Sequence, residues 1–527
     1  MDKTGQQPKK VIVREKSSMT KLFILLVPLC FILLFRGGVS ALEAKITIDI
    51  EKTGVPVNRL ILGSNVQWID RGDELLEGTS LQFSRSMLQK VKEIGPTIIR
   101  YPGGSLSDLY HWKDGIGGIA DRKKNQHFYV KNRWDAILMG TTEFLQLCKI
   151  LGAEPLITVN VVTGTAEEAT KWVEYTNKSR VKGADGTLLP AVKYWEIGNE
   201  PYLKDENRGD LAMSPEEFAK RANNFIRNMR RVDSSLKIGI PLRSDRFGGQ
   251  YATPYQGYNE KVLKGITEPF DFVALHNAYL PFAGDKKYRD EDLYRAAMAG
   301  SLVVKDDFAF TRSLLEKFFP NRAIKLAVTE YNAFFSMGGK STDSYNESFV
   351  GALYVADLIN LFAQTDDLLM ANFWSLTGNG YFGAISNEGR LRPSYAVLKG
   401  YNNILRGNYL PLKLESTVFE NTAVGFVPGN RNVPTLSVLG TRDKNIIRIV
   451  AINKDISNSI NTSISFVRQQ KISSISYQEL NEQDYFNVGR RSRVAEWGKG
   501  RTELKQVPFT LALKAHSITI IEIRLRG

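Results

Sequence analysis

Strand-like apolar runs and helical runs take turns over most of the chain. Eight strand-like runs can be counted, at residues 59–68, 97–104, 155–161, 193–200, 236–242, 270–279, 324–332 and 368–376. Strand, helix and strand repeated in this way imply parallel strands joined by right-handed crossovers. Because eight strands are the number that a closed barrel needs, we predict an α/β fold with a (β/α)8 TIM barrel.

Two of the helical runs carry clear start signals. Thr165 and Glu168 are spaced as a capping box, and so are Ser214 and Glu217. In the second box Pro215 takes the first helical position, where its missing N–H costs nothing. We therefore predict helices that begin at these two points.

The helical period disappears past about residue 405. Short alternating runs follow at 435–440, 445–453, 459–466 and 516–525. They predict a C-terminal antiparallel β-sandwich packed against the barrel, and we expect the lone alternating strand KITIDI near the N-terminus to join it. The predicted parts are an N-terminal segment (1–44), a strand of the sandwich (45–58), the barrel (59–404) and the sandwich (405–527).

The N-terminal segment is typical of export. A basic tail precedes an apolar run at 22–35, which is 14 residues long and fits a signal-peptide core better than a full membrane span. Small residues suited to a signal peptidase follow at Val39–Ala41. A cleaved signal and a short uncleaved anchor are both compatible with this pattern. Either way we expect the body to be secreted, periplasmic or membrane-tethered, outside the cytoplasm.

Composition excludes several classes of protein. The formal net charge is +14, of which residues 1–21 supply +4, and the basic body suits an acidic polymer or simply a solvated surface. We find no nucleic-acid signature and no phosphate loop. The four histidines are widely spaced and Cys148 is the one cysteine of the body, so we expect no metal, no cofactor and no internal disulfide.

Two predicted strands end on a carboxylate. The run KYWEIGNEP at 193–201 stops at a polar break that contains Glu200, and the run at 324–332 ends on Glu330. A barrel brings the ends of its strands to one mouth, so the two glutamates should face each other. Two facing carboxylates are what glycoside hydrolysis requires, and a separation of roughly 5 Å gives retention of configuration.

At these motifs the chain resembles glycoside hydrolase clan A, most closely family 51, the α-L-arabinofuranosidase family that also holds some endoglucanases. The resemblance rests on four blocks in order, RYPGGSLSDLYHWKDGIG (100–117), TGTAEEATKWVEY (163–175), VKYWEIGNEP (192–201) and TEYN (329–332). It implies Glu200 as the acid/base, Glu330 as the nucleophile and Asn199 as the donor to the sugar 2-hydroxyl.

The resemblance also implies substrate-binding residues at other strand ends. Arg100 and Asn160 would hold the nucleophile or the substrate, His276 and Tyr279 would lie beside the nucleophile, and Trp374 would form a platform for a sugar face. Ordinary structural explanations stay open. The alternative for Arg100 is a buried ion pair that serves stability alone, whereas His276 and Trp374 would serve equally as core residues. Glu200 itself would serve as a helix-starting residue, with the asparagine before it as the cap.

The sequence departs from family 51 at two positions. Pro201 stands where a methionine is common, and Thr329 and Tyr331 flank Glu330 where aspartate and tryptophan are common. We expect a retaining hydrolase of a cell-wall or extracellular polysaccharide or oligosaccharide, with an α-L-arabinofuranoside as the leading substrate. The alternatives are an endo-acting hydrolase of a β-glycan or acidic exopolysaccharide, and a non-catalytic carbohydrate-binding barrel. Tyrosines at 251, 255 and 258 are candidates to stack on sugars.

Overall fold

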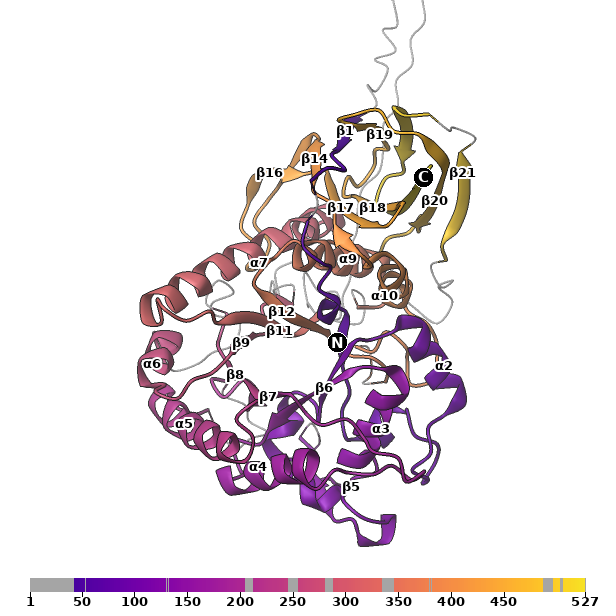
Figure 1. Cartoon of the computed structure of the whole chain (residues 1–527). Helices are drawn as coiled ribbons and strands as arrows, with labels where there is room; N and C mark the ends of the chain where they lie inside the picture. Colours follow the sequence, from indigo (N-terminus) through magenta and orange to yellow (C-terminus); the bar gives the residue numbers. More distant parts are fainter. Residues whose placement is uncertain are drawn as a thin grey trace, which may run out of the picture. The chain divides into compact units, whose positions relative to one another are not determined.

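Eight parallel strands form a closed barrel in the computed structural model (Figure 1). The structure describes residues 42–52, 54–128, 130, 132–203, 212–244, 255–279, 288–333, 346–378, 380, 382–486, 496–502 and 506–526. The barrel strands, in order, are β2 (Gly63–Asn65), β3 (Ile98–Tyr101), β6 (Glu154–Val159), β7 (Tyr194–Ile197), β8 (Lys237–Pro241), β9 (Phe272–Leu275), β11 (Lys325–Asn332) and β12 (Leu368–Phe373). Strand β12 pairs with β2 and closes the ring, so the predicted TIM barrel is confirmed.

Two predicted strands differ from the structure. Arg59–Leu62 forms a 3-10 helix because the side chain of Asn58 accepts a hydrogen bond from the Leu60 amide and starts a helical turn. The strand β2 begins only afterwards. The run at 270–279 is divided, since β9 ends at Leu275 and the short β10 (Ala278–Tyr279) pairs with the end of β11.

Helices cover the outside of the barrel (Figure 1). They are α2 (Arg85–Ile94), α3 (Thr141–Leu151), α4 (Ala166–Val173), α5 (Pro215–Val232), α6 (Tyr258–Gly265), α7 (Asp290–Phe318), α9 (Phe349–Ala363) and α10 (Pro393–Ile404), with a short α1 (Asp70–Asp73) before them. Both predicted start signals are confirmed. Thr165 caps α4 by accepting from the Glu168 amide, and Ser214 caps α5 by accepting from the Glu217 amide.

The barrel interior is filled in layers. The lower layer is apolar and consists of Ile98, Leu156, Tyr194, Phe272, Ala274, Ala327 and Met370. Successive inward positions on a strand are two residues apart, so the next layer toward the carboxyl ends begins at residues 100, 158, 196 and 329. All four of these residues are polar and fully buried: Arg100, Thr158, Glu196 and Thr329. The polar layer sits directly on the apolar one, below the mouth of the barrel.

Two larger sheets are built from strands that follow the barrel in sequence, together with β1 (Leu42–Ile48), which precedes it, and they are antiparallel except for the pair of β1 with β19 (Ile460–Phe466). One has six strands: β13 (Asn408–Tyr409), β17 (Leu436–Asp443), β18 (Ile446–Asn453), β23 (Ser517–Leu525), β20 (Ile472–Asn481) and β21 (Gly498–Thr502). The other combines β14 (Leu412–Glu415), β1, β19 and β22 (Phe509–Leu513), and a separate hairpin joins β15 (Val418–Asn421) to β16 (Asn430–Pro434). Apolar residues of both larger sheets share one core, including Ile46, Ile464, Ile449 and Ile521, so the predicted sandwich is confirmed.

The first strand of the described chain is an internal strand of the sandwich. Strand β1 pairs antiparallel with β14, where Ile48 faces Leu412, and parallel with β19, where Leu42 faces Ile460. It begins three residues before the expected start at residue 45.

A buried ion pair joins the barrel helices to the sandwich. The Lys454 ammonium, just after β18, donates to the Asp357 carboxylate of α9 at 3.2 Å and to the Met298 carbonyl of α7 at 3.1 Å. Both charged side chains are less than 5 % exposed.

No helix within the described residues is long and apolar enough to cross a bilayer. The apolar run at 22–35 lies outside the described part of the chain.

Candidate active site

Glu200 follows β7 on a tight turn. Gly198 has φ +80°, and a Cβ at that position would lie 2.2 Å from a Val161 methyl, so only glycine fits. Glu200 itself has φ +42°, a region that residues with a side chain rarely enter. Local strain of this kind is typical of functional residues that the surrounding structure holds in place. The turn brings the carboxylate of Glu200 to the barrel mouth, where its side chain is 15 % exposed.

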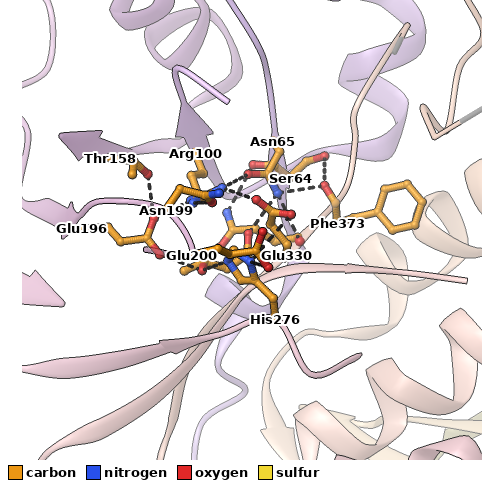
Figure 2. Close-up of polar contacts among 12 residues, drawn as sticks. Ser64, Asn65, Arg100, Thr158, Glu196, Asn199, Glu200, His276, Glu330 and Phe373 are labelled. Atoms are coloured by element: carbon orange, nitrogen blue, oxygen red, sulfur yellow. Dashed lines mark hydrogen bonds and ion pairs between the residues drawn. The ribbon is translucent and has the colours of Figure 1, made fainter. Parts of the chain in front are cut away.

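One imidazole contacts both predicted catalytic carboxylates (Figure 2). His276, just past β9, places Nδ1 at 3.0 Å from Glu200 Oε1 and at 3.8 Å from Glu330 Oε2. These two oxygens are therefore at most about 6.8 Å apart, since 3.0 and 3.8 Å add to that limit. Burial lowers the pKa of His276, but the neighbouring Glu330 and Glu200 carboxylates outweigh it and raise the pKa above its usual value.

Arg100 binds the second carboxylate from below. Its Nη1 donates to Glu330 Oε1 at 2.8 Å, and its Nη2 donates to the side-chain oxygen of Asn199 at 2.8 Å. The amide nitrogen of Asn199 is then left buried with no partner in the described part of the chain. An unmade hydrogen bond on a buried donor is costly, so this nitrogen is well placed to bind a ligand group. Arg100 therefore does more than form a structural ion pair, because it also orients the side chains of Glu330 and Asn199.

Glu330 accepts a second hydrogen bond at its other oxygen. Tyr279 Oη, on β10, donates to Glu330 Oε2 at 3.1 Å. Burial raises the pKa of Glu330, and the positive charges of His276 and Arg100 lower it only in part, so the pKa stays above its usual value. The carboxylate is held by three groups from three different strand ends.

Trp374 and Glu330 both lie beside Gly104. A Cβ on Gly104 would meet Glu330 Oε1 at 2.6 Å and the edge of the Trp374 ring at 3.2 Å. Gly104 is therefore needed for space, and the ring edge of Trp374 borders the site. The indole is 4 % exposed and packs edge-on against Phe382, with the ring centroids 6.5 Å apart.

Comparison with known proteins gives the family. The signature described as the alpha-L-arabinofuranosidase 1 domain matches residues 90–261. The chain is 26% identical over 397 residues to an intracellular exo-alpha-L-arabinofuranosidase of Bacteroides ovatus, covering 71% of this chain and 73% of that one. It is 32% identical to alpha-L-arabinofuranosidase C of Emericella nidulans, over 70% of this chain and 75% of the relative. The chain belongs to the α-L-arabinofuranosidase family.

Solved structures agree on the fold of this arabinofuranosidase-family glycosidase. The alpha-L-arabinofuranosidase of Thermotoga maritima in complex with arabinose superposes with a TM-score of 0.77 at 22% identity, over 92% of this chain and all of that one. A GH51 enzyme of Thermotoga petrophila gives 0.76 at 23% identity, over 91% of this chain and all of that one. The predicted resemblance to clan A near family 51 is confirmed.

Asn160 is not brought to the carboxylate pair in this arabinofuranosidase-family chain. Its side-chain oxygen accepts from the amides of Val162 and Thr163, and its nitrogen donates to the Thr163 hydroxyl and to the Tyr110 carbonyl. These four hydrogen bonds hold the loop after β6. A role for Asn160 toward substrate stays a prediction.

The tyrosines expected to stack on sugars behave differently. Tyr258 is fully buried and starts α6, so the expectation is wrong for this residue. Tyr255 packs against Tyr258, with the ring centroids 6.4 Å apart. Tyr251 lies outside the described residues. The sequence did not single out Tyr202. Its ring centroid lies 5.7 Å from that of Tyr258, and its hydroxyl donates a hydrogen bond to Glu200 Oε1 at 3.3 Å.

Two further site residues were missed from the sequence. Glu196 accepts from Arg100 Nε at 2.6 Å, and Asn65 accepts from Arg100 Nη1 at 3.3 Å while it donates to the Thr329 carbonyl (Figure 2). Glu196 did carry a signal, because it is a charged residue in the middle of the apolar strand that starts at Tyr194. Residues two apart share a face, so a buried Tyr194 already placed Glu196 inside the barrel.

Proposed function

We propose that this protein is a retaining α-L-arabinofuranosidase that uses Glu200 as acid/base and Glu330 as nucleophile. The observation that carries the proposal is the single His276 nitrogen that lies within 4 Å of both carboxylates. It limits the separation of the two oxygens to at most about 6.8 Å, which includes the separation of roughly 5 Å typical of a covalent intermediate and reaches only the lower end of the range that holds a water molecule between the carboxylates.

The two glutamates differ in surroundings as the mechanism needs. Glu330 is held by Arg100 and Tyr279 in a fixed orientation, as suits attack on the anomeric carbon. Glu200 is more exposed and lies beside a titratable imidazole, as suits a group that gives a proton to the leaving oxygen and later takes one from water. The unpartnered amide nitrogen of Asn199 would donate to the sugar 2-hydroxyl.

The substrate is proposed to be a terminal α-L-arabinofuranosyl unit on a polysaccharide or oligosaccharide. Support comes from relatives that are named as arabinofuranosidases. The partly filled mouth, where Trp374 borders Glu330, gives an apolar surface next to the nucleophile.

The test is a screen of residues 41–527 against a panel of aryl glycosides. Hydrolysis of the aryl α-L-arabinofuranoside should be lost in Glu330→Gln, and azide should accelerate turnover by Glu200→Ala with retention of configuration. An inverted azide adduct, or full activity of Glu330→Gln, would rule out the assigned roles. Activity on polymers alone would favour an endo-acting glycanase, and silence on both would favour a binding protein.

We also propose that the catalytic body is exported by the N-terminal segment. The apolar run at 22–35 between basic residues, followed by small residues at 39–41, supports this. Fractionation of cells that express the full chain should place the activity outside the cytoplasm, and deletion of residues 22–35 should retain it inside. Recovery of the full chain in the cytoplasmic fraction would rule export out.

A further inference from the structure

A third carboxylate lies beneath the proposed catalytic pair and takes no part in the proposed reaction. Glu196 is in the middle of β7 and its side chain is fully buried. It accepts three hydrogen bonds: from Arg100 Nε at 2.6 Å, from the Thr158 hydroxyl at 2.6 Å and from the Thr329 hydroxyl at 2.9 Å. All three partners donate to the Glu196 carboxylate, which holds the polar layer together through its acceptor oxygens.

The first contact of Glu196 reaches the nucleophile. The guanidinium of Arg100 is planar, so a fixed Nε also fixes the directions of the two terminal nitrogens. Those two nitrogens donate to Glu330 and to Asn199. Glu196 therefore sets the position from which Arg100 holds the nucleophile and turns the Asn199 amide toward the site.

The second contact of Glu196 reaches the acid/base. The Thr329 hydroxyl has one hydrogen, which it donates to Glu196. The Thr329 oxygen must therefore act as the acceptor in its hydrogen bond with His276 Nε2, 3.0 Å away. His276 then carries a proton on Nε2. In the neutral imidazole, Nδ1 is the unprotonated nitrogen, and it faces Glu200 Oε1, ready to accept a hydrogen bond from the protonated acid.

We propose that Glu196 is a positioning residue that orients both catalytic groups, the nucleophile through Arg100 and the acid/base through Thr329 and His276. The inference rests on the proposed roles of the two glutamates. One buried carboxylate, which touches neither substrate nor leaving group, fixes the proton arrangement of the whole site.

The arrangement predicts how the site titrates. With Glu196 neutralised, the full charge of Arg100 would act on Glu330 and lower its pKa, so the acid limb of the pH–rate profile would move to lower pH. His276, Glu200 and Tyr279 are the other titratable groups that face Glu330, and they are unchanged in such a variant.

The first test is Glu196→Gln. Its amide would donate to Thr329, whose own hydrogen would turn to His276 and favour the other tautomer, with the Nδ1 proton facing Glu200. Because a small misplacement of catalytic groups is costly, kcat should fall about 100-fold while KM changes little. Both limbs of the pH–rate profile should move to lower pH. Glu196→Asp keeps the carboxylate and should return both limbs part of the way to their original pH.

The matched control is Glu143→Gln. Glu143, on α3, is another buried carboxylate in an arginine pair. It accepts from Arg122 Nη2 at 2.8 Å and from the Gly140 amide just before α3 at 2.9 Å. Its neutralisation should lower the melting temperature and leave kcat and both pH limbs unchanged. A purely structural Glu196 would behave in the same way as Glu143.

A second pair of variants separates the two contacts and keeps the test decisive if Glu196→Gln does not fold. Thr329→Val removes the hydroxyl that accepts from His276 and should move only the basic limb to lower pH, whereas Thr329→Ser keeps the hydroxyl and should restore it. A folded Glu196→Gln with kcat within about threefold of the unchanged protein, or a Thr329→Val profile that superposes on it, would overturn the proposal. Glu330→Gln is measured alongside, because activity in that variant would contradict the proposed function instead.

Discussion

Arg100 Nη2 donates to the side-chain oxygen of Asn199 at 2.8 Å and so decides which end of that amide faces the site. The oxygen is occupied from below, and the nitrogen is left as a buried donor with no partner among the described residues. A preorganised donor next to a developing charge stabilises a transition state more than a ground state.

Asn199→Ala should therefore lower kcat about 100-fold on an aryl arabinofuranoside, with a smaller effect on KM. The matched control is a substrate that lacks the 2-hydroxyl. On the 2-deoxy analogue, where the partner of the amide is missing, Asn199→Ala should cause almost no further loss. Equal losses on both substrates would show that Asn199 does not act on the 2-hydroxyl.

Tyr279→Phe should lower kcat/KM about 10- to 100-fold, because a hydrogen bond to a charged oxygen is lost. The hydroxyl favours the ionised form of Glu330, so its removal raises the pKa of that carboxyl. The acid limb of the pH–rate profile should move to higher pH, opposite to the shift expected for Glu196→Gln.

Tyr331→Phe is the control for this measurement. Tyr331 follows Glu330 directly, but its hydroxyl is buried with no partner in the described structure, so its loss should leave the pH profile in place and the protein at least as stable. A shift of the acid limb in Tyr331→Phe and none in Tyr279→Phe would contradict the geometry.

Asp73 should make the protein less stable as pH rises. Burial raises the pKa of Asp73 to about 7, against the hydrogen bonds that it accepts from Gln67. The folded protein then binds a proton that the unfolded chain releases above the ordinary pKa of 3.8. The stabilising effect is complete below pH 3.8 and is lost as pH rises through about 7, by up to about 4 kcal/mol.

Asp73→Asn removes this titration. Its oxygen would still accept from the Gln67 backbone amide, and its new NH2 would donate to the Gln67 side-chain oxygen after the Gln67 amide turns over, since that oxygen now has no partner in the described part of the chain. The difference in unfolding free energy between the variant and the unchanged protein should grow from pH 4 to pH 8 in favour of the variant. Denaturant titrations at four pH values measure it, and a flat difference would refute the raised pKa.

Lys454→Met should lower the free energy of unfolding by about 3–5 kcal/mol, because it leaves the Asp357 carboxylate buried without its cation. The double variant Lys454→Met/Asp357→Leu should recover much of this loss. The exposed pair Lys413–Glu415 offers the control, since Lys413→Met should leave stability unchanged. A loss as large for Lys413→Met would mean that burial is not the cause.

The barrel and the two carboxylates were predictable because they depend on local patterns. Apolar runs marked the strands, and Glu200 and Glu330 stood where those runs end, which in a barrel is one mouth. The alternating runs likewise marked β17, β18, β19 and β23.

The polar layer below the mouth was predicted only at Arg100, which the resemblance to family 51 implied would hold the nucleophile or the substrate. Arg100 and Glu330 are 230 positions apart, so no local pattern carries their contact, which exists only because the barrel closes. Glu196 was hidden inside an apolar run, and the tautomer of His276 depends on a hydroxyl from another strand. The helical turn at Arg59–Leu62 was missed because Asn58 overrides a strand-like sequence by capping it.

The place of β1 in the sandwich has a consequence for synthesis on the ribosome. Ile48 pairs with Leu412, 364 positions later (412 minus 48), and the other neighbour of β1, the strand β19, comes later still. At ordinary translation rates the first strand waits roughly 20 to 70 s for its partners while the whole barrel is made. The four-stranded sheet therefore forms only after the barrel has been made, and a chain that stops before β14 leaves β1 with two unpaired edges.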